Sequence, residues 1–186
     1  LDSDERCTNE ARDEILQIVR ESDFNNPNDP VAYLMPRKNY LLGRWVKHSG
    51  WYPDYRQPQL FKKGKFKYTL ELVHEGFSAD GKVAELKKPI WQFPFENLAQ
   101  MLHKANRYST LNAERLQQDK KGGFAKGLFH GVAIFIRNYF LRLGFLDGRA
   151  GFAIAMGNFI GTFYKYAKLA ELQAQWSEPS ASDDSE

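Results

Sequence analysis

The spacing of hydrophobic residues changes character near residue 93. Before that point, short apolar runs alternate with turn-forming residues, such as the Asp80-Gly81 pair, a pattern typical of strands and hairpins. From Phe95 onward, apolar residues recur every three or four positions, which indicates helices. The pattern therefore predicts a strand-containing part over residues 1–92 and a helical part over residues 93–172.

One helix is also expected near the start of the chain. Thr8 or Asn9 can cap it, and acidic residues fill its first turns, where the helix dipole favours negative charge. We expect it to end at about Glu21, before a loop rich in Asn, Asp and Pro. Its apolar stripe consists of Ile15, Ile18 and Val19.

Strands are expected at several places between this helix and residue 92. Gly43 interrupts one apolar run, and Lys63-Gly64 marks a hairpin turn. The Asp80-Gly81 turn predicts a strand that returns antiparallel beside the one before it. The predicted strands cover residues 31–36, 39–46, 59–69, 70–76 and 82–86.

The helical part contains three candidate helices. The first carries an apolar stripe at Leu98, Met101, Leu102, Ala105 and Tyr108 and extends to about Leu116. The other two span residues 128–146 and 152–169, and neither has the roughly 18 uninterrupted apolar residues of a membrane-spanning helix. Their mixture of aromatic and basic residues fits an anchor lying in a membrane surface, and equally an ordinary helical hairpin. Residues 173–186 read as a disordered acidic tail.

Charge is strongly segregated along the 186 residues, although the net charge is only +3. Residues 35–67 hold nine basic residues against Asp54 alone, and residues 115–168 hold nine against Asp119 and Asp147. Such basic blocks imply anionic partners, namely phosphates, nucleic acid or an anionic membrane face. The single cysteine, Cys7, excludes an internal disulfide.

Three stretches carry candidate chemistry. Asp2 and Asp4 present carboxylate oxygens, which Mg²⁺ and Mn²⁺ prefer, although an Asp-x-Asp is equally an acidic turn before a helix. His74 and Glu75 together offer an acid/base group, or a surface ion pair. An aromatic and basic cluster over residues 43–56 offers sugar platforms and phosphate clamps, or rings that cap the core. That cluster includes Arg44, Trp45, His48, Trp51, Tyr52 and Arg56.

Several motifs in one order carry a resemblance to a known family. They lie at residues 1–5 (LDSDE), 39–45 (NYLLGRW), 50–54 (GWYPD), 59–61 (QLF), 73–75 (VHE), 106–109 (NRYS) and 139–148 (YFLRLGFLDG). Together they resemble the family 2 glycosyltransferases of the lipopolysaccharide-core glucosyltransferase type. One departure is Gln92, where many relatives carry a His.

The resemblance implies an α/β fold: the second half of a GT-A, Rossmann-like domain over residues 1–92, followed by a helical, membrane-associating extension. In that family the Asp-x-Asp lies about midway along the catalytic domain. We therefore expect this chain to be a C-terminal half that lacks the units gripping the nucleotide base, and activity of the chain alone is not implied.

The resemblance also implies roles for single residues. Asp4 would bind a divalent metal (Mg²⁺ or Mn²⁺) with support from Asp2, and Glu75 would be the catalytic base. The substrate-binding residues would be His74, Arg44, Trp51 and Arg56. The expected partners are a nucleotide-sugar donor, a lipid-linked or lipopolysaccharide-core acceptor and an anionic membrane surface, with no nucleic acid. The location implied is cytoplasmic, peripheral to the inner membrane.

A rival from another class is a non-catalytic module that binds an anionic membrane or nucleic acid. Basic blocks interleaved with aromatic residues support it, because such surfaces hold phosphates and stack bases. No recognisable nucleic-acid-binding motif accompanies them. Convergence of Asp2, Asp4 and Glu75 on one cleft would favour the transferase.

Overall fold

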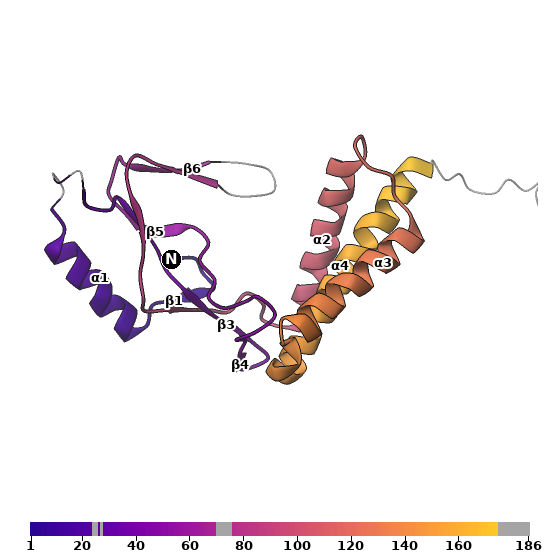
Figure 1. The fold of residues 1–186 in the computed structure, drawn as a ribbon, viewed down its shortest axis with the longest axis horizontal. Helices are drawn as coiled ribbons and strands as arrows, with labels where there is room; N and C mark the ends of the chain where they lie inside the picture. The colour runs from indigo at the N-terminus through magenta and orange to yellow at the C-terminus, as the bar shows by residue number, and fades with distance from the viewer. Residues whose placement is uncertain (24–25, 27, 70–75, 175–186) are drawn as a thin grey trace, which may run out of the picture. The chain divides into compact units, whose positions relative to one another are not determined.

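The computed structural model describes residues 1–23, 26, 28–69 and 76–174. The chain divides into two compact units, Leu1–Glu96 and Asn97–Glu186, called the sheet unit and the helical unit below. Figure 1 shows small mixed sheets and one helix in the first, and packed helices in the second. The fold is therefore mixed α/β, with small sheets followed by a helical region.

The sheet unit contains one helix and nine short strands within its described residues. Four strands form a sheet in the order β1-β9-β3-β4, three form β5-β2-β8, and two form β6-β7. The pairs β3–β9 and β2–β8 are parallel and the others antiparallel. The elements are β1 (Glu5–Arg6), α1 (Asn9–Glu21), β2 (Ala32–Leu34), β3 (Arg37–Leu41), β4 (Arg44–Trp45), β5 (Pro58–Phe61), β6 (Phe66–Thr69), β7 (Gly76–Ala79), β8 (Val83–Glu85) and β9 (Ile90–Gln92).

Helix α1 begins and ends as the sequence predicts. The Thr8 hydroxyl caps it by accepting from the Ala11 N–H at 3.1 Å, and it also donates to the Pro89 carbonyl at 2.9 Å. Ile15 and Ile18 pack on the core, but Val19 is 48% exposed, so the predicted stripe was wrong there. The core beneath the helix consists of Ala11, Met35, Leu86 and Ile90, with Ile15, Ile18, Tyr33 and Leu60 against it.

Two predicted strand pairings were wrong. The chain does turn at residues 62–65, where the Lys65 N–H donates to the Lys62 carbonyl, but β5 pairs with β2 and β6 with β7. After the Asp80-Gly81 turn, β8 pairs in parallel with β2 instead of returning beside β7. Turn residues reverse the chain locally, whereas the pairing partner depends on which strand edge is free. Residues 70–75 lie outside the described residues.

The helical unit contains α2 (Leu98–Leu116), α3 (Phe124–Ile136), a π-helical turn η1 (Arg137–Leu141), a 3-10 turn η2 (Gly144–Asp147) and α4 (Gly148–Ala174). Asn97 caps α2 by accepting from the Gln100 N–H at 2.8 Å. The helix predicted at residues 128–146 is not continuous, because Leu143 has a φ of 56° between the two turns. Of the predicted tail, Gln173 and Ala174 belong to α4, and the rest lies outside the described residues.

Small residues let α3 and α4 approach closely. A Cβ at Gly131 would lie 2.9 Å from the Phe159 ring, and one at Gly127 would lie 2.8 Å from the Phe163 carbonyl oxygen. Lys168 joins α4 to α2, since its ammonium donates to the side chains of Asn106 at 2.7 Å and Thr110 at 2.7 Å. Within the part of the chain that is described, every helix is too short or too polar to cross a membrane.

Candidate functional site

The Asp-x-Asp motif lies on a tight turn that leads into β1. The Glu5 N–H donates to the Asp2 carbonyl at 3.0 Å, which closes four residues into a turn. The Asp2 side chain is exposed and that of Asp4 is half-buried. The two carboxylates therefore belong to a turn, which is one of the two interpretations that the sequence left open.

Gln92 connects this turn to the centre of the sheet. Its side-chain N–H donates to an Asp4 carboxylate oxygen at 3.3 Å, and the Phe93 N–H donates to the Asp4 carbonyl at 2.8 Å. Gln92 lies opposite Glu5 on β1 and opposite Asn39 on β3. It therefore stands between the acidic turn and β3, the strand on which the aromatic loop of residues 46–57 is anchored.

Asn39 holds that loop in place. Its side-chain N–H donates to the Trp51 carbonyl at 3.1 Å and to an Asp54 carboxylate oxygen at 3.0 Å. The Arg37 N–H adds a bond to the Asp54 carbonyl at 3.2 Å. Since β3 pairs with β9, these bonds anchor the loop over residues 46–57 on the strand next to β9.

A buried ion pair lies beneath these residues. The Arg37 Nε donates to a Glu5 carboxylate oxygen at 2.7 Å, with the two side chains 4% and 0% exposed. Burial acts to raise the pKa of Glu5, but hydrogen bonds from Arg37, the Asp2 N–H and Gln59 outweigh it and lower the pKa. Glu5 is therefore a structural carboxylate, held ionised at neutral pH.

Two amide oxygens at the centre of this network lack partners. Asn39 is 1% exposed and Gln92 is 5% exposed, and neither side-chain oxygen accepts a hydrogen bond from the described residues. Buried polar atoms are nearly always satisfied, so such oxygens mark a place where a further donor or a cation would be favourable. Both are hard oxygen ligands of the kind that Mg²⁺ accepts.

Aromatic rings and cations cover the other side of the β3–β4 hairpin. The ammonium groups of Lys38 and Lys47 lie 4.6 and 4.5 Å from the Trp45 ring centre. Tyr52 meets the same ring edge-on at 5.3 Å. The two ammonium groups therefore give this aromatic surface a positive charge.

The remaining predicted residues fall in different places. Arg44 is exposed on β4, and Trp51 is half-buried, with its ring 6.5 Å from that of Phe95. Arg56 forms an ion pair with Asp54, its guanidinium at 2.9 Å. His74 and Glu75 lie outside the described residues. The structure thus connects Asp4 and Trp51 through neighbouring strands.

Sequence reasoning missed the buried polar residues that make this connection. The predicted site did not include Glu5, Arg37, Asn39, Asp54 or Gln59. The structure, and not the sequence pattern, shows that alternate residues of β3, namely Arg37, Asn39 and Leu41, are the buried ones. Polar residues at two of those three inward positions indicate a functional or structural network.

The donors for a metal are few. Within the described residues, no group of three or more His, Cys, Asp or Glu side chains is placed to hold a metal ion. A cation on the acidic turn would therefore rely on the Asp2 and Asp4 carboxylates, the Gln92 amide oxygen and non-protein oxygens.

No protein-family model matches the chain, and no solved structure matches it.

Proposed function

We propose that the sheet unit belongs to the catalytic domain of an inverting glycosyltransferase that uses a nucleotide-sugar donor and a lipid-linked or lipopolysaccharide-type acceptor. The observation that carries the proposal is the strand order β1-β9-β3, because it leaves only β9 between the strand that follows the Asp-x-Asp turn and the strand that anchors the aromatic loop. The order of the sequence motifs supports the same assignment. On this proposal, the small sheets are the second half of a GT-A, Rossmann-like domain.

On this proposal, the acidic turn would hold a divalent metal of the Mg²⁺ or Mn²⁺ type. Its donors are carboxylate oxygens, and the unpartnered Gln92 oxygen belongs to the same amide that contacts Asp4. When bound there, such an ion would neutralise charge on the leaving diphosphate. The buried Glu5–Arg37 pair would keep the turn in position, since Glu5 bonds to the Asp2 N–H at 3.1 Å.

The acceptor would lie against the aromatic loop. Trp51 offers a ring for a sugar face, and Asn39 fixes its backbone. Arg44 is exposed and within reach of an acceptor phosphate. Arg56 is held by Asp54, so we assign it to positioning this loop first and to phosphate contact second.

Glu75 would serve as the catalytic base, with His74 orienting it or the acceptor. The acceptor oxygen attacks the anomeric carbon, its proton passes to the Glu75 carboxylate, and the bond to the nucleoside diphosphate breaks on the opposite face. A base in this role contributes about 10²–10⁴-fold to rate.

The test is Glu75→Gln in the protein, assayed for sugar transfer from a panel of nucleotide sugars to membrane lipid extracts. We expect turnover at saturating donor to fall about 10²–10⁴-fold. Glu85→Gln, at an exposed position on β8, is the matched control and should leave turnover unchanged. Equal turnover in the Glu75 variant and the wild type would remove Glu75 as the base.

The metal assignment has a separate test. Mn²⁺ binding to the purified protein can be followed by water-proton relaxation. Asp4→Asn should weaken binding about 10-fold or more, because it removes a charged ligand. Asp13→Asn, an exposed aspartate on α1, should bind as the wild type does. Identical binding by both variants would contradict a metal on this turn.

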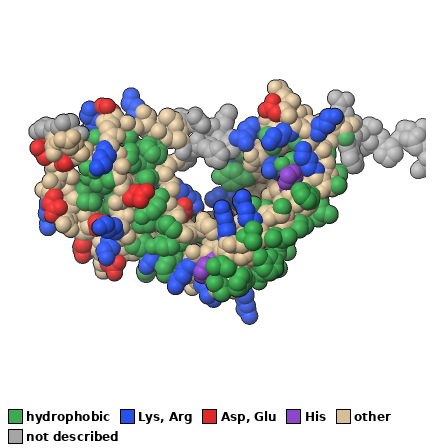
Figure 2. Space-filling model, in the orientation of Figure 1, with side chains coloured by type: hydrophobic (Ala, Val, Ile, Leu, Met, Phe, Trp, Pro, Cys, Tyr) green, Lys and Arg blue, Asp and Glu red, His purple; other side chains and the backbone are tan. Residues whose placement is uncertain are grey.

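A second function is favoured by the surface of the helical unit. Large apolar side chains there are open to solvent, including Phe129 at 71% and Leu141 at 75%. Figure 2 shows hydrophobic side chains gathered over the segment where α3 ends and α4 begins, with Lys and Arg among them. Patches of this kind mark interaction surfaces, and the added basic residues suit an anionic membrane. We propose in-plane association with the cytoplasmic side of the inner membrane.

Vesicle flotation tests this second function. Vesicles that contain phosphatidylglycerol should carry the protein upward, and phosphatidylcholine vesicles should carry less. Phe129→Ser with Leu141→Ser should reduce flotation several-fold, because each removes buried apolar area from the bilayer surface. Leu98→Ser, on α2 and 43% exposed, is the control. Protein that stays unbound with both lipids would exclude the membrane role.

A further inference from the structure

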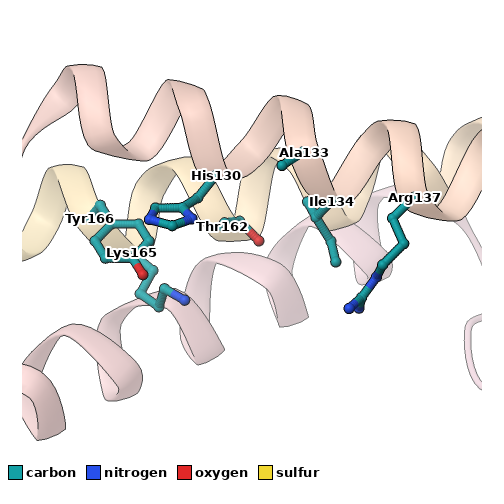
Figure 3. Close-up of a pocket in the computed structure, with 7 residues that line it drawn as sticks. All are labelled: His130, Ala133, Ile134, Arg137, Thr162, Lys165 and Tyr166. Carbon is teal, nitrogen blue, oxygen red and sulfur yellow. The ribbon is translucent and has the colours of Figure 1, made fainter.

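A cavity of about 290 Å³ lies in the helical unit. Figure 3 shows its lining side chains on α3, on the start of η1 and on α4. The ones that carry the argument are His130, Arg137, Thr162, Lys165 and Tyr166. The volume is at the small end of ligand pockets, so it suits one compact group rather than a large molecule.

The charge of the lining is one-sided. Arg137 and Lys165 are cationic, and the described residues that line the cavity include no carboxylate. The pKa of Lys165 is lowered, first by burial and then by the positive charges of Lys120 and Arg115. The cavity is therefore a place where an anion would relieve electrostatic strain.

The side chains are arranged to receive such an anion. In Figure 3 the Lys165 ammonium and the Arg137 guanidinium extend to the same side of the α3–α4 pair, with the Thr162 hydroxyl and the Ile134 side chain between them. The His130 ring is stacked on Tyr166 with centres 4.9 Å apart, and the Lys165 ammonium lies 4.6 Å from the Tyr166 ring centre. These contacts fix the imidazole and the ammonium before any ligand binds.

The backbone at Arg137 adds a second observation. Arg137 begins the π-helical turn η1, and the Arg142 N–H donates to its carbonyl at 2.8 Å. Single π-turns inside helices occur frequently at functional sites, because the extra residue redirects a side chain. Arg137, whose guanidinium lines the cavity, is the first residue of this turn.

We propose that this cavity binds a phosphate group, held by the guanidinium of Arg137, the ammonium of Lys165 and the hydroxyl of Thr162. A guanidinium fork matches two oxygens of a phosphate, and a lysine supplies a compact point charge. The phosphate can belong to a membrane-lipid headgroup or be free in solution. The site does not depend on the proposed transferase activity, since its residues all belong to the helical unit.

The test is an NMR titration of the isotope-labelled chain with inorganic phosphate. We expect amide shifts at cavity residues of α3 and α4, and Kd at least about 10-fold weaker in a Lys165→Met, Arg137→Gln double variant. Lys121→Met with Arg149→Gln removes the same charges from exposed positions outside the cavity and should bind phosphate as the wild type does. Circular dichroism melts show whether the cavity variant stays folded, which we expect because Lys165→Met removes an uncompensated charge.

A second arm uses phosphatidylcholine vesicles containing phosphatidic acid. Vesicle binding that free phosphate competes away, and that the cavity variant weakens more than the control variant, identifies a lipid headgroup. If both double variants bind vesicles equally and only the cavity variant loses phosphate binding, the ligand of the cavity is a soluble phosphate. Phosphate shifts that lie elsewhere, or that the two double variants weaken equally, would overturn the site.

Discussion

The two units treat buried charge in opposite ways. In the sheet unit, Glu5 and Arg37 are almost fully buried and neutralise each other at 2.7 Å. In the helical unit, Lys165 is half-buried, and the charges that act on its pKa are the cations Lys120 and Arg115. A paired buried charge fixes a structure, whereas an unpaired one leaves a favourable place for a ligand. The buried pair therefore stabilises the sheet unit, and Lys165 belongs to the cavity for which we propose phosphate binding.

The largest expected effect comes from breaking the buried pair. Arg37→Met leaves Glu5 buried without its partner, which should destabilise the sheet unit by about 3–5 kcal/mol. Urea unfolding followed by tryptophan fluorescence measures this in a Trp176→Phe background, where the remaining tryptophans all lie in residues 1–96. Adding Glu5→Leu should recover part of the loss. A loss below about 1 kcal/mol in the single variant would mean that the pair does not hold the turn.

Smaller changes in stability, of opposite sign, are expected from substitutions at two glycines of α4. A Cβ at Gly151 would lie 1.8 Å from the Gly144 carbonyl oxygen, so Gly151→Ala should destabilise the helical unit by about 1–3 kcal/mol. At Gly161 the nearest atom would be 3.8 Å away, and Gly161→Ala should stabilise the unit by up to about 1 kcal/mol. Thermal melts by circular dichroism at 222 nm compare them. Changes of the same sign would contradict the close packing at Gly151.

Acid should lower the stability of the sheet unit, because Glu5 becomes protonated. Its pKa is lowered from 4.5 in the folded state, so its contribution to stability is complete above that value and is lost as the pH falls through the folded pKa. Stability measured from pH 7 down to pH 2 should fall more steeply in the wild type than in Glu5→Gln. Asp80→Asn is the control: Lys65 lowers the pKa of Asp80, but that carboxylate is exposed. If Asp80→Asn reduced the pH dependence of stability more than Glu5→Gln does, the acid effect would belong to Asp80 and not to Glu5.

The smallest effect should come from Lys165, whose pKa is affected by neighbouring cations and, among the described residues, by no carboxylate. Burial and like charges lower the pKa of Lys165 from 10.5, so the folded state binds that proton less tightly than the unfolded state does. Lys165→Met should therefore stabilise the helical unit at pH 7, by at most about 1 kcal/mol after solvent screening. Wild-type stability should also rise as the pH increases toward 10.5, and that rise should shrink in the variant. Destabilisation by Lys165→Met at pH 7 would show that the contact of the ammonium with the Tyr166 ring outweighs the cost of burial and like charges.

The sequence by itself determined the local elements. Thr8 predicted the start of α1, because its side chain caps a free N–H group. The apolar spacing from Leu98 onward predicted α2 as a helix, but Leu98, Leu102 and Tyr108 of that stripe are exposed. Such signals depend on residues close together in the sequence, so they can be identified without knowledge of the tertiary structure. The change from strands to helices near residue 93 is of the same kind.

Only the tertiary structure decided which elements meet. Turn residues could not show that β8 joins β2, or that Gln92 stands between Asp4 and Asn39. Leu143 adopts a positive φ that its own preference disfavours, which divides the helix predicted at residues 128–146. The physical reason is the same in each case: strand pairing, buried amides and close helix contacts depend on partners far along the chain, and their free energy outweighs local preference.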